Sequence, residues 1–105
     1  TNDIRNSASI KLIDLLLDKG YKIKSYDPKA VYNLENENYN QFNDLYSSLE
    51  SSSCVVIMTE WEEFESLDLN KTSELMKENI ILDMRNLLNL DKKNINKFKY
   101  YGLGN

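Results

Sequence analysis

The residues best suited to chemistry are an acid and an arginine that directly follow an apolar run. Ile80, Ile81 and Leu82 are mostly β-branched, which predicts a short strand buried on both faces. Asp83 and Arg85 follow, where a parallel strand would deliver its carboxyl end to the surface, the edge at which open α/β sheets bind ligands. An arginine held there can offer a planar fork of donors to a phosphate or carboxylate. The alternative is an ordinary surface arginine that pairs with Asp83 or a nearby glutamate.

Several kinds of chemistry are excluded by what the chain lacks. It contains no histidine, so the commonest general base and the commonest metal ligand are both missing. Cys54 is the single cysteine and falls in an apolar run, which favours a small buried hydrophobic residue over a reactive thiol. We predict no metal site, and any chemistry of this chain alone would have to use carboxylates, lysine, tyrosine or Cys54, none of which we assign a catalytic role.

The composition and charge of the chain limit the kinds of partner that it can bind. The 105 residues fit one domain and one core, with 41% hydrophobic residues, 29% charged residues and a net charge of −4. Lysines and acids are interspersed, which argues against nucleic acid, because binding its backbone needs a clustered cationic face. No apolar run approaches the roughly 20 residues of a membrane helix, and the cysteine usage favours a reducing, cytoplasmic location. The start at Thr1 predicts a piece of a longer protein.

The periodicity of apolar residues predicts alternating helices and strands. Helices are expected over residues 7–19 (with Gly20 as the C-cap), 39–49, from 62, around 71–77 and over 91–98, and strands over residues 21–26, 54–58, 80–82 and 99–101. This order predicts an α/β fold, a Rossmann-like three-layer sandwich with a mainly parallel sheet. No Gly-x-Gly-x-x-Gly follows the first strand, so the chain is not itself a dinucleotide-binding half.

Four motifs in this order carry a family resemblance. They are Thr1-Asn2-Asp3-Ile4-Arg5-Asn6-Ser7, Tyr26-Asp27-Pro28, Thr59-Glu60-Trp61 with Glu63-Phe64, and Leu82-Asp83-Met84-Arg85-Asn86 with Tyr101-Gly102-Leu103-Gly104. Each motif alone is weak, but the ordered set resembles the C-terminal, UDP-binding domain of the UDP-glucose/GDP-mannose dehydrogenase family. The resemblance covers residues 1–105, and Trp61 makes it most similar to the UDP-glucose 6-dehydrogenase branch.

The resemblance implies a reaction and partners that lie largely outside this chain. In that family, an N-terminal domain binds NAD, a central helix makes the homodimer, and the C-terminal domain closes over the UDP-sugar. The enzyme oxidises the sugar C6 alcohol to a carboxylate in two NAD-dependent steps, which supply polysaccharide biosynthesis. The nucleophilic cysteine, the catalytic lysine and the glycine fingerprint precede the stretch that this chain resembles. The isolated chain is therefore expected to be inactive.

Two arginines match the family's binding positions. Arg5, expected just before a helix, corresponds by resemblance to an arginine that reaches NAD. Arg85 corresponds to one that contacts the sugar nucleotide. Glu60 stays without a firm role, Trp61 is interpreted as structural, and Asp83 as an orienter of Arg85 or a structural acceptor rather than a general base.

Other functions remain open on the sequence. The sugar substrate could be of the UDP-N-acetyl-hexosamine type within the same family. A non-catalytic α/β interaction module, such as a receiver-like domain, is a different class, but Asp27-Pro28 lacks the paired acids that a receiver's metal pocket needs.

Overall fold

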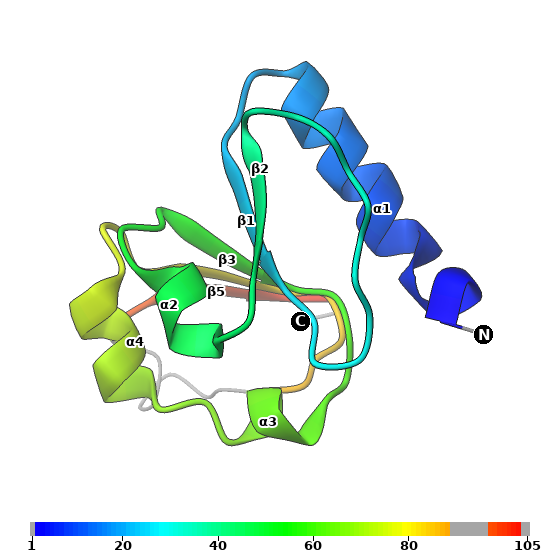
Figure 1. Cartoon of the computed structure of the whole chain (residues 1–105). Helices are drawn as coiled ribbons and strands as arrows, with labels where there is room; N and C mark the ends of the chain where they lie inside the picture. The colour runs from blue at the N-terminus through cyan, green and yellow to red at the C-terminus, as the bar shows by residue number, and fades with distance from the viewer. Residues whose placement is uncertain (1, 89–96, 104–105) are drawn as a thin grey trace. The chain divides into compact units, whose positions relative to one another are not determined.

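The computed structural model describes residues 2–88 and 97–103, with side chains from residue 8 onward (Figure 1). The chain divides into two compact units, Thr1–Ser48 and Leu49–Asn105, which are described separately. Each unit holds one parallel sheet, of two strands in the first and three strands in the second. This confirms the predicted α/β class with parallel strands. None of the described helices has the length and apolar character needed to cross a bilayer.

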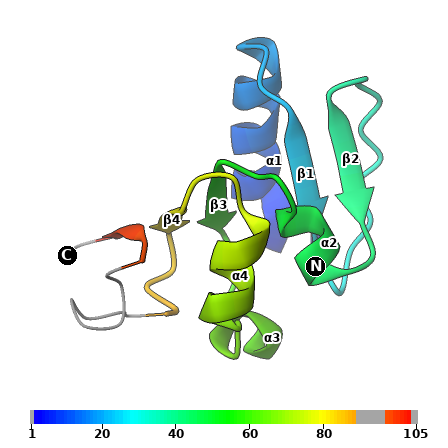
Figure 2. The ribbon, with the colours of Figure 1, turned by 90° about the vertical axis from the view of Figure 1, so that its left-hand side faces the viewer.

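The first unit consists of one long helix and a pair of strands. Helix α1 (Asn2–Asp18) lies beside the pair formed by β1 (Ile23–Tyr26) and β2 (Tyr39–Phe42), as Figures 1 and 2 show. The helix ends in a Schellman motif, in which the Tyr21 N–H donates to the Leu16 carbonyl (3.1 Å) and the Gly20 N–H to that of Leu17 (3.0 Å). Gly20 has a φ of +89°, so the predicted C-cap is confirmed.

Helix α1 begins five residues earlier than predicted, at Asn2 instead of Ser7. Serine favours cap positions, but it is also tolerated inside a helix. The residue type of Ser7 was therefore not enough to locate the start of the helix. Consequently Arg5 lies within α1, and the prediction that it precedes the helix was wrong.

Residues 39–49 form a strand and a short helix, where the sequence predicted one helix. Tyr39–Phe42 pairs in parallel with β1, and α2 covers only Leu45–Leu49. The apolar residues keep helical spacing, but Tyr39 is buried and its hydroxyl lies 2.6 Å from that of Ser25 on β1. Tertiary pairing therefore outweighed local periodicity.

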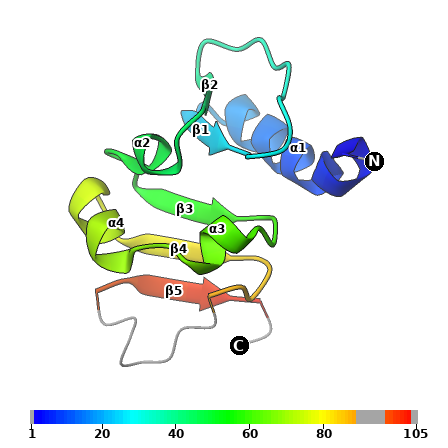
Figure 3. The ribbon, with the colours of Figure 1, turned by 60° about the horizontal axis from the view of Figure 1, so that its bottom comes forward.

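The second unit carries the sheet that positions the candidate site. Its strands lie in the order β3 (Cys54–Ile57), β4 (Ile80–Asp83) and β5 (Lys99–Gly102), side by side in Figure 3. Helices α3 (Glu62–Glu65) and α4 (Leu69–Leu75) belong to the connection from β3 to β4 and lie on one face of this sheet. All three strands were predicted, as were the two helices within a few residues.

The buried side chains of this unit centre on β4. Ile81 and Thr72 have no exposed surface, and other buried apolar residues are Leu49, Ile57, Met76 and Phe98. Cys54 is exposed, so its predicted burial was wrong: it is the first residue of β3 and of the apolar run. Partial desolvation still raises the pKa of its thiol. The helix predicted over residues 91–98 lies mostly outside the described residues.

The C-cap of α1 gives a test of the first unit. Gly20→Ala should lower the free energy of unfolding by about 1 kcal/mol, because an L-residue resists the left-handed backbone there. No atom would clash with the added methyl group, so the cost comes from the backbone alone. Urea unfolding would measure it, with Lys19→Ala as the neighbouring control. Equal stability of Gly20→Ala and the parent chain would contradict the cap.

Candidate functional site

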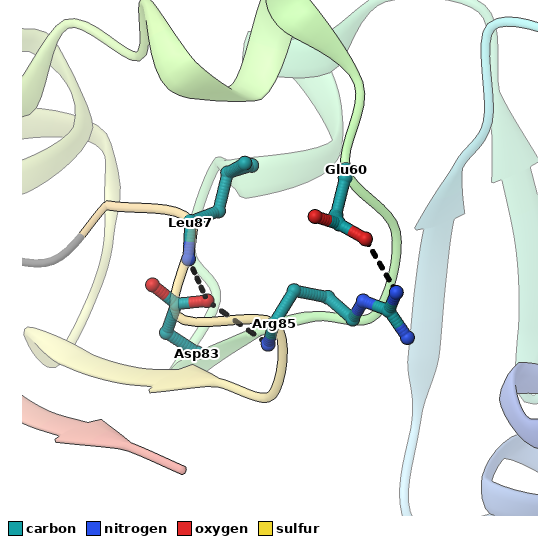
Figure 4. Close-up of polar contacts among 4 residues, drawn as sticks. All are labelled: Glu60, Asp83, Arg85 and Leu87. Carbon is teal, nitrogen blue, oxygen red and sulfur yellow. Dashed lines mark hydrogen bonds and ion pairs between the residues drawn. The ribbon is translucent and has the colours of Figure 1, made fainter. Parts of the chain in front are cut away.

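The candidate site lies where β3 and β4 end. Ile57 pairs with Asp83 in the parallel register, so the two strands finish at the same edge of the sheet. The Met84 N–H donates to the Ile57 carbonyl (3.0 Å), which keeps the chains together one residue further. Glu60 follows the end of β3 and Arg85 follows the end of β4. The two residues therefore come from neighbouring strand ends, although 25 positions separate them in the chain (Figure 4).

The carboxylate of Asp83 organises the loop that carries Arg85. The residue has no exposed surface, and its Oδ1 accepts the backbone N–H groups of Arg85 (3.2 Å) and Leu87 (3.0 Å). Its Oδ2 accepts the Leu88 N–H (2.8 Å) and the Tyr100 hydroxyl (2.8 Å). Burying a carboxylate costs free energy unless it is hydrogen-bonded, and here each of the two oxygens accepts hydrogen bonds from two donors.

The protonation state of Asp83 follows from these contacts. Burial by itself raises the pKa of the carboxyl group, because it disfavours the charged form. The hydrogen bonds from the loop amides and from Tyr100 outweigh burial, so the pKa lies below its ordinary value of 3.8. Asp83 is therefore ionised near neutral pH and acts as a hydrogen-bond acceptor, as predicted from the sequence.

The backbone of the residue that directly follows β5 closes the other side of this loop. The Leu103 N–H donates to the Asp83 carbonyl (3.2 Å), and the Asn86 side-chain amide donates to the Leu103 carbonyl. Asn86 has a φ of +52°, a left-handed conformation that asparagine tolerates better than most residues. The loop is thus held by contacts from both its own strand and its neighbour.

The guanidinium group of Arg85 is the part of this loop that can meet an anion. Asp83 already accepts the N–H groups of Arg85, Leu87 and Leu88, so these amides are not available as a phosphate cradle. The Arg85 side chain is 49% exposed, and Figure 4 shows it extending away from the Asp83 carboxylate towards Glu60. Its Nη2 donates to the Glu60 Oε2. Arg85 thus forms an ion pair with a nearby glutamate, which was the alternative given in the sequence analysis, while Asp83 orients the Arg85 backbone.

The sequence singled out two further residues, Arg5 and Trp61. Arg5 belongs to the first unit, and its role at NAD stays a prediction. The Trp61 carbonyl accepts the Phe64 N–H (2.9 Å) at the start of α3. Among the described residues, no three His, Cys, Asp or Glu side chains are grouped as a metal site requires.

Asp27, in the first unit, is a structural acceptor. Its Oδ1 accepts the N–H groups of Lys29 (2.8 Å) and Ala30 (3.1 Å), and its Oδ2 the Tyr32 hydroxyl (3.2 Å). Burial, together with the charge of Asp27, raises the pKa of Tyr32 to about 12, which keeps that hydroxyl a donor. The carboxylate is used within its own turn, which gives no support to a receiver-like acidic pocket.

Two contributors were missed or left open by the sequence. Tyr100 had no assigned role, and only the register of β5 beside β4 reveals that its hydroxyl reaches Asp83. Glu60 could be linked to Arg85 only once β3 and β4 were known to be neighbours. The sequence did contain one signal, since both residues follow apolar strand-like runs.

The acceptor role of Asp83 predicts a loss of stability on neutralisation. Asp83→Asn should lower the free energy of unfolding by about 2–4 kcal/mol at pH 7, because an amide cannot accept all four donors. The folded-state pKa is depressed, so the carboxylate stabilises the fold above pH 3.8 and loses this effect as the pH falls through the folded-state value.

Urea unfolding of both proteins between pH 7 and pH 2 would measure this difference, which should shrink at the acidic end. Asp14→Asn, at an exposed residue of α1, is the matched control and should change stability by less than about 0.5 kcal/mol. A difference between Asp83→Asn and the parent that stays constant with pH would contradict an ionised acceptor.

Comparisons with known proteins agree with the resemblance read from the motifs. Residues 1–90 match the family described as "UDP-glucose/GDP-mannose dehydrogenase family, UDP binding domain". UDP-glucose 6-dehydrogenase of Rickettsia bellii is 39% identical over 99% of this chain, and TuaD of Bacillus subtilis, with the same enzyme name, is 30% identical over 99%. The chain covers 25% and 23% of those proteins, about a quarter of their length.

A solved structure supports the fold. The UDP-D-ManNAc dehydrogenase of Pyrococcus horikoshii superposes with a TM-score of 0.58 over 98% of this chain and 31% of its own, at 16% sequence identity. The ordered motifs, the parallel strands and the matched residues lead to one conclusion. The chain belongs to the UDP-glucose/GDP-mannose dehydrogenase family, as its UDP-binding domain.

Proposed function

We propose that this chain is the sugar-nucleotide-binding domain of an NAD-dependent UDP-glucose 6-dehydrogenase, and that Arg85 binds the UDP-sugar. The observation that carries the proposal is the placement of an exposed guanidinium at the carboxyl edge of a parallel sheet, on a loop fixed by Asp83. An arginine fork suits phosphate better than a lysine, because it can donate two parallel hydrogen bonds.

The choice of UDP-glucose rests on the relatives and one motif. Several relatives carry the name UDP-glucose 6-dehydrogenase, and Trp61 in Thr59-Glu60-Trp61 resembles that branch most. The solved neighbour acts on a different UDP-sugar, but at 16% identity it informs the fold only. Comparing turnover of UDP-glucose with that of UDP-N-acetyl-hexosamines in the full-length protein would decide between them.

The remaining parts of the proposal concern the whole enzyme. NAD would be bound mainly by a domain outside this chain, with Arg5 of α1 reaching it from the C-terminal side. The nucleophilic cysteine would also come from outside, since Cys54 does not match its motif, so this chain alone would not turn over substrate. The full-length protein would be a cytoplasmic homodimer.

Removing the Arg85 guanidinium tests the binding assignment. In the full-length protein, Arg85→Ala should weaken UDP binding by about 2 kcal/mol, the scale of a lost charge-assisted contact. Isothermal titration calorimetry with UDP would measure this change, and kcat/KM for UDP-glucose should fall by a similar factor.

Lys77→Ala is the matched control for the Arg85 variant. It removes one exposed positive charge from the same unit, before β4 instead of after it, and should leave UDP affinity unchanged. If Arg85→Ala bound UDP as tightly as the parent protein, the assignment of Arg85 to the nucleotide would be wrong.

A further inference from the structure

We propose that Glu60 is an internal competitor for the nucleotide. Its carboxylate contacts the Arg85 guanidinium, and the diphosphate of the ligand must displace it to bind. This inference rests on the proposed function of Arg85 and adds a residue that limits which anions can bind there.

Glu60 contacts the same group, the Arg85 guanidinium, that an anionic ligand would have to contact. Because Ile57 and Asp83 are in register, the segments after β3 and β4 run from the same sheet edge, and Glu60 reaches Arg85 across it (Figure 4). The contact is made by one carboxylate oxygen on one terminal nitrogen. This single-point contact leaves most of the planar donor fork facing other directions.

The contact is also weak enough to be exchanged. The side chains of Arg85 and Glu60 are 49% and 56% exposed, and exposed ion pairs contribute little to stability because water screens them. A diphosphate has several charged oxygens and can take two donors of the fork, whereas Glu60 takes one. Displacement by a diphosphate is therefore favourable, while an anion with a single charge gains little over the carboxylate already present.

The other acid of the loop cannot play this part. Asp83 is fully buried, and both its oxygens are taken by backbone N–H groups and by Tyr100. Glu60 therefore supplies the negative charge at the guanidinium, and any anion bound there must either replace it or lie beside it. Both arrangements cost affinity, and a repulsive element of this kind is a common source of specificity.

Neutralising Glu60 distinguishes a residue that competes with the nucleotide for Arg85 from one that only holds Arg85 in place. Glu60→Gln keeps the shape and a carbonyl acceptor for Arg85 but removes the charge, so competition predicts tighter UDP binding, by about two- to fivefold for an exposed pair. A residue that merely held Arg85 in place would predict unchanged or weaker binding. Calorimetry with UDP on the full-length protein would measure the change.

Two variants control this experiment. Glu62→Gln removes the same charge from the first turn of α3 and should leave affinity unchanged. In Glu60→Gln/Arg85→Ala, affinity should equal that of Arg85→Ala alone, because the competitor acts only through the guanidinium. Thermal unfolding of each variant would verify that the fold is intact.

The outcomes separate this inference from the proposed function. Tighter binding by Glu60→Gln that depends on Arg85 supports competition. If Arg85→Ala loses affinity but Glu60→Gln binds UDP equally or more weakly, Glu60 is not a competitor and the role of Arg85 stands. If Arg85→Ala binds UDP like the parent protein, the proposed function of Arg85 fails and the competitor role fails with it.

Discussion

A buried carboxylate with four donors determines the arrangement of the candidate site. The Asp83 side chain would be unfavourable in the interior on its own, and its hydrogen bonds to the loop amides and to Tyr100 make its burial possible. Those same bonds fix the path of the chain directly after β4. The position of the Arg85 backbone is therefore a consequence of how Asp83 is satisfied.

This constraint divides the loop into two functional parts. The amides face inwards to Asp83, and the guanidinium faces outwards, where it contacts Glu60. A site of this kind uses a side-chain charge and not a backbone cradle for anion binding. The loop backbone, which is bound to Asp83, fixes the position of the Arg85 backbone. The exposed part of the Arg85 side chain can exchange one anionic partner for another.

The strands of the second unit and their parallel direction could be predicted, because β3 and β4 are short apolar runs followed by polar residues and helices alternate with strands along the chain. Predictions failed where pairing between distant segments decided the outcome. Tyr39–Phe42 became a strand through its partner β1, and Cys54 is exposed because of its place at the start of β3. Local periodicity shows neither which segment a strand will pair with nor which residue of an apolar run will be exposed.

The same limit applies to the candidate site. Arg85 was identified from its own neighbours in the sequence, since an arginine after a buried strand is a local pattern. The partnership of Glu60 with Arg85 and that of Tyr100 with Asp83 depend on strand order, which the sequence does not contain. The ligand that we propose comes from the family resemblance, because neither periodicity nor charge could provide it.

We expect the loop after β4 to stay fixed by Asp83 while Arg85 exchanges Glu60 for the nucleotide. The most direct measurement is a crystal structure of the full-length protein with UDP bound. The account predicts guanidinium–phosphate hydrogen bonds at Arg85, no contact between Arg85 and Glu60, and unchanged bonds from the loop amides to Asp83. UDP bound elsewhere, with the Arg85–Glu60 pair intact, would contradict it.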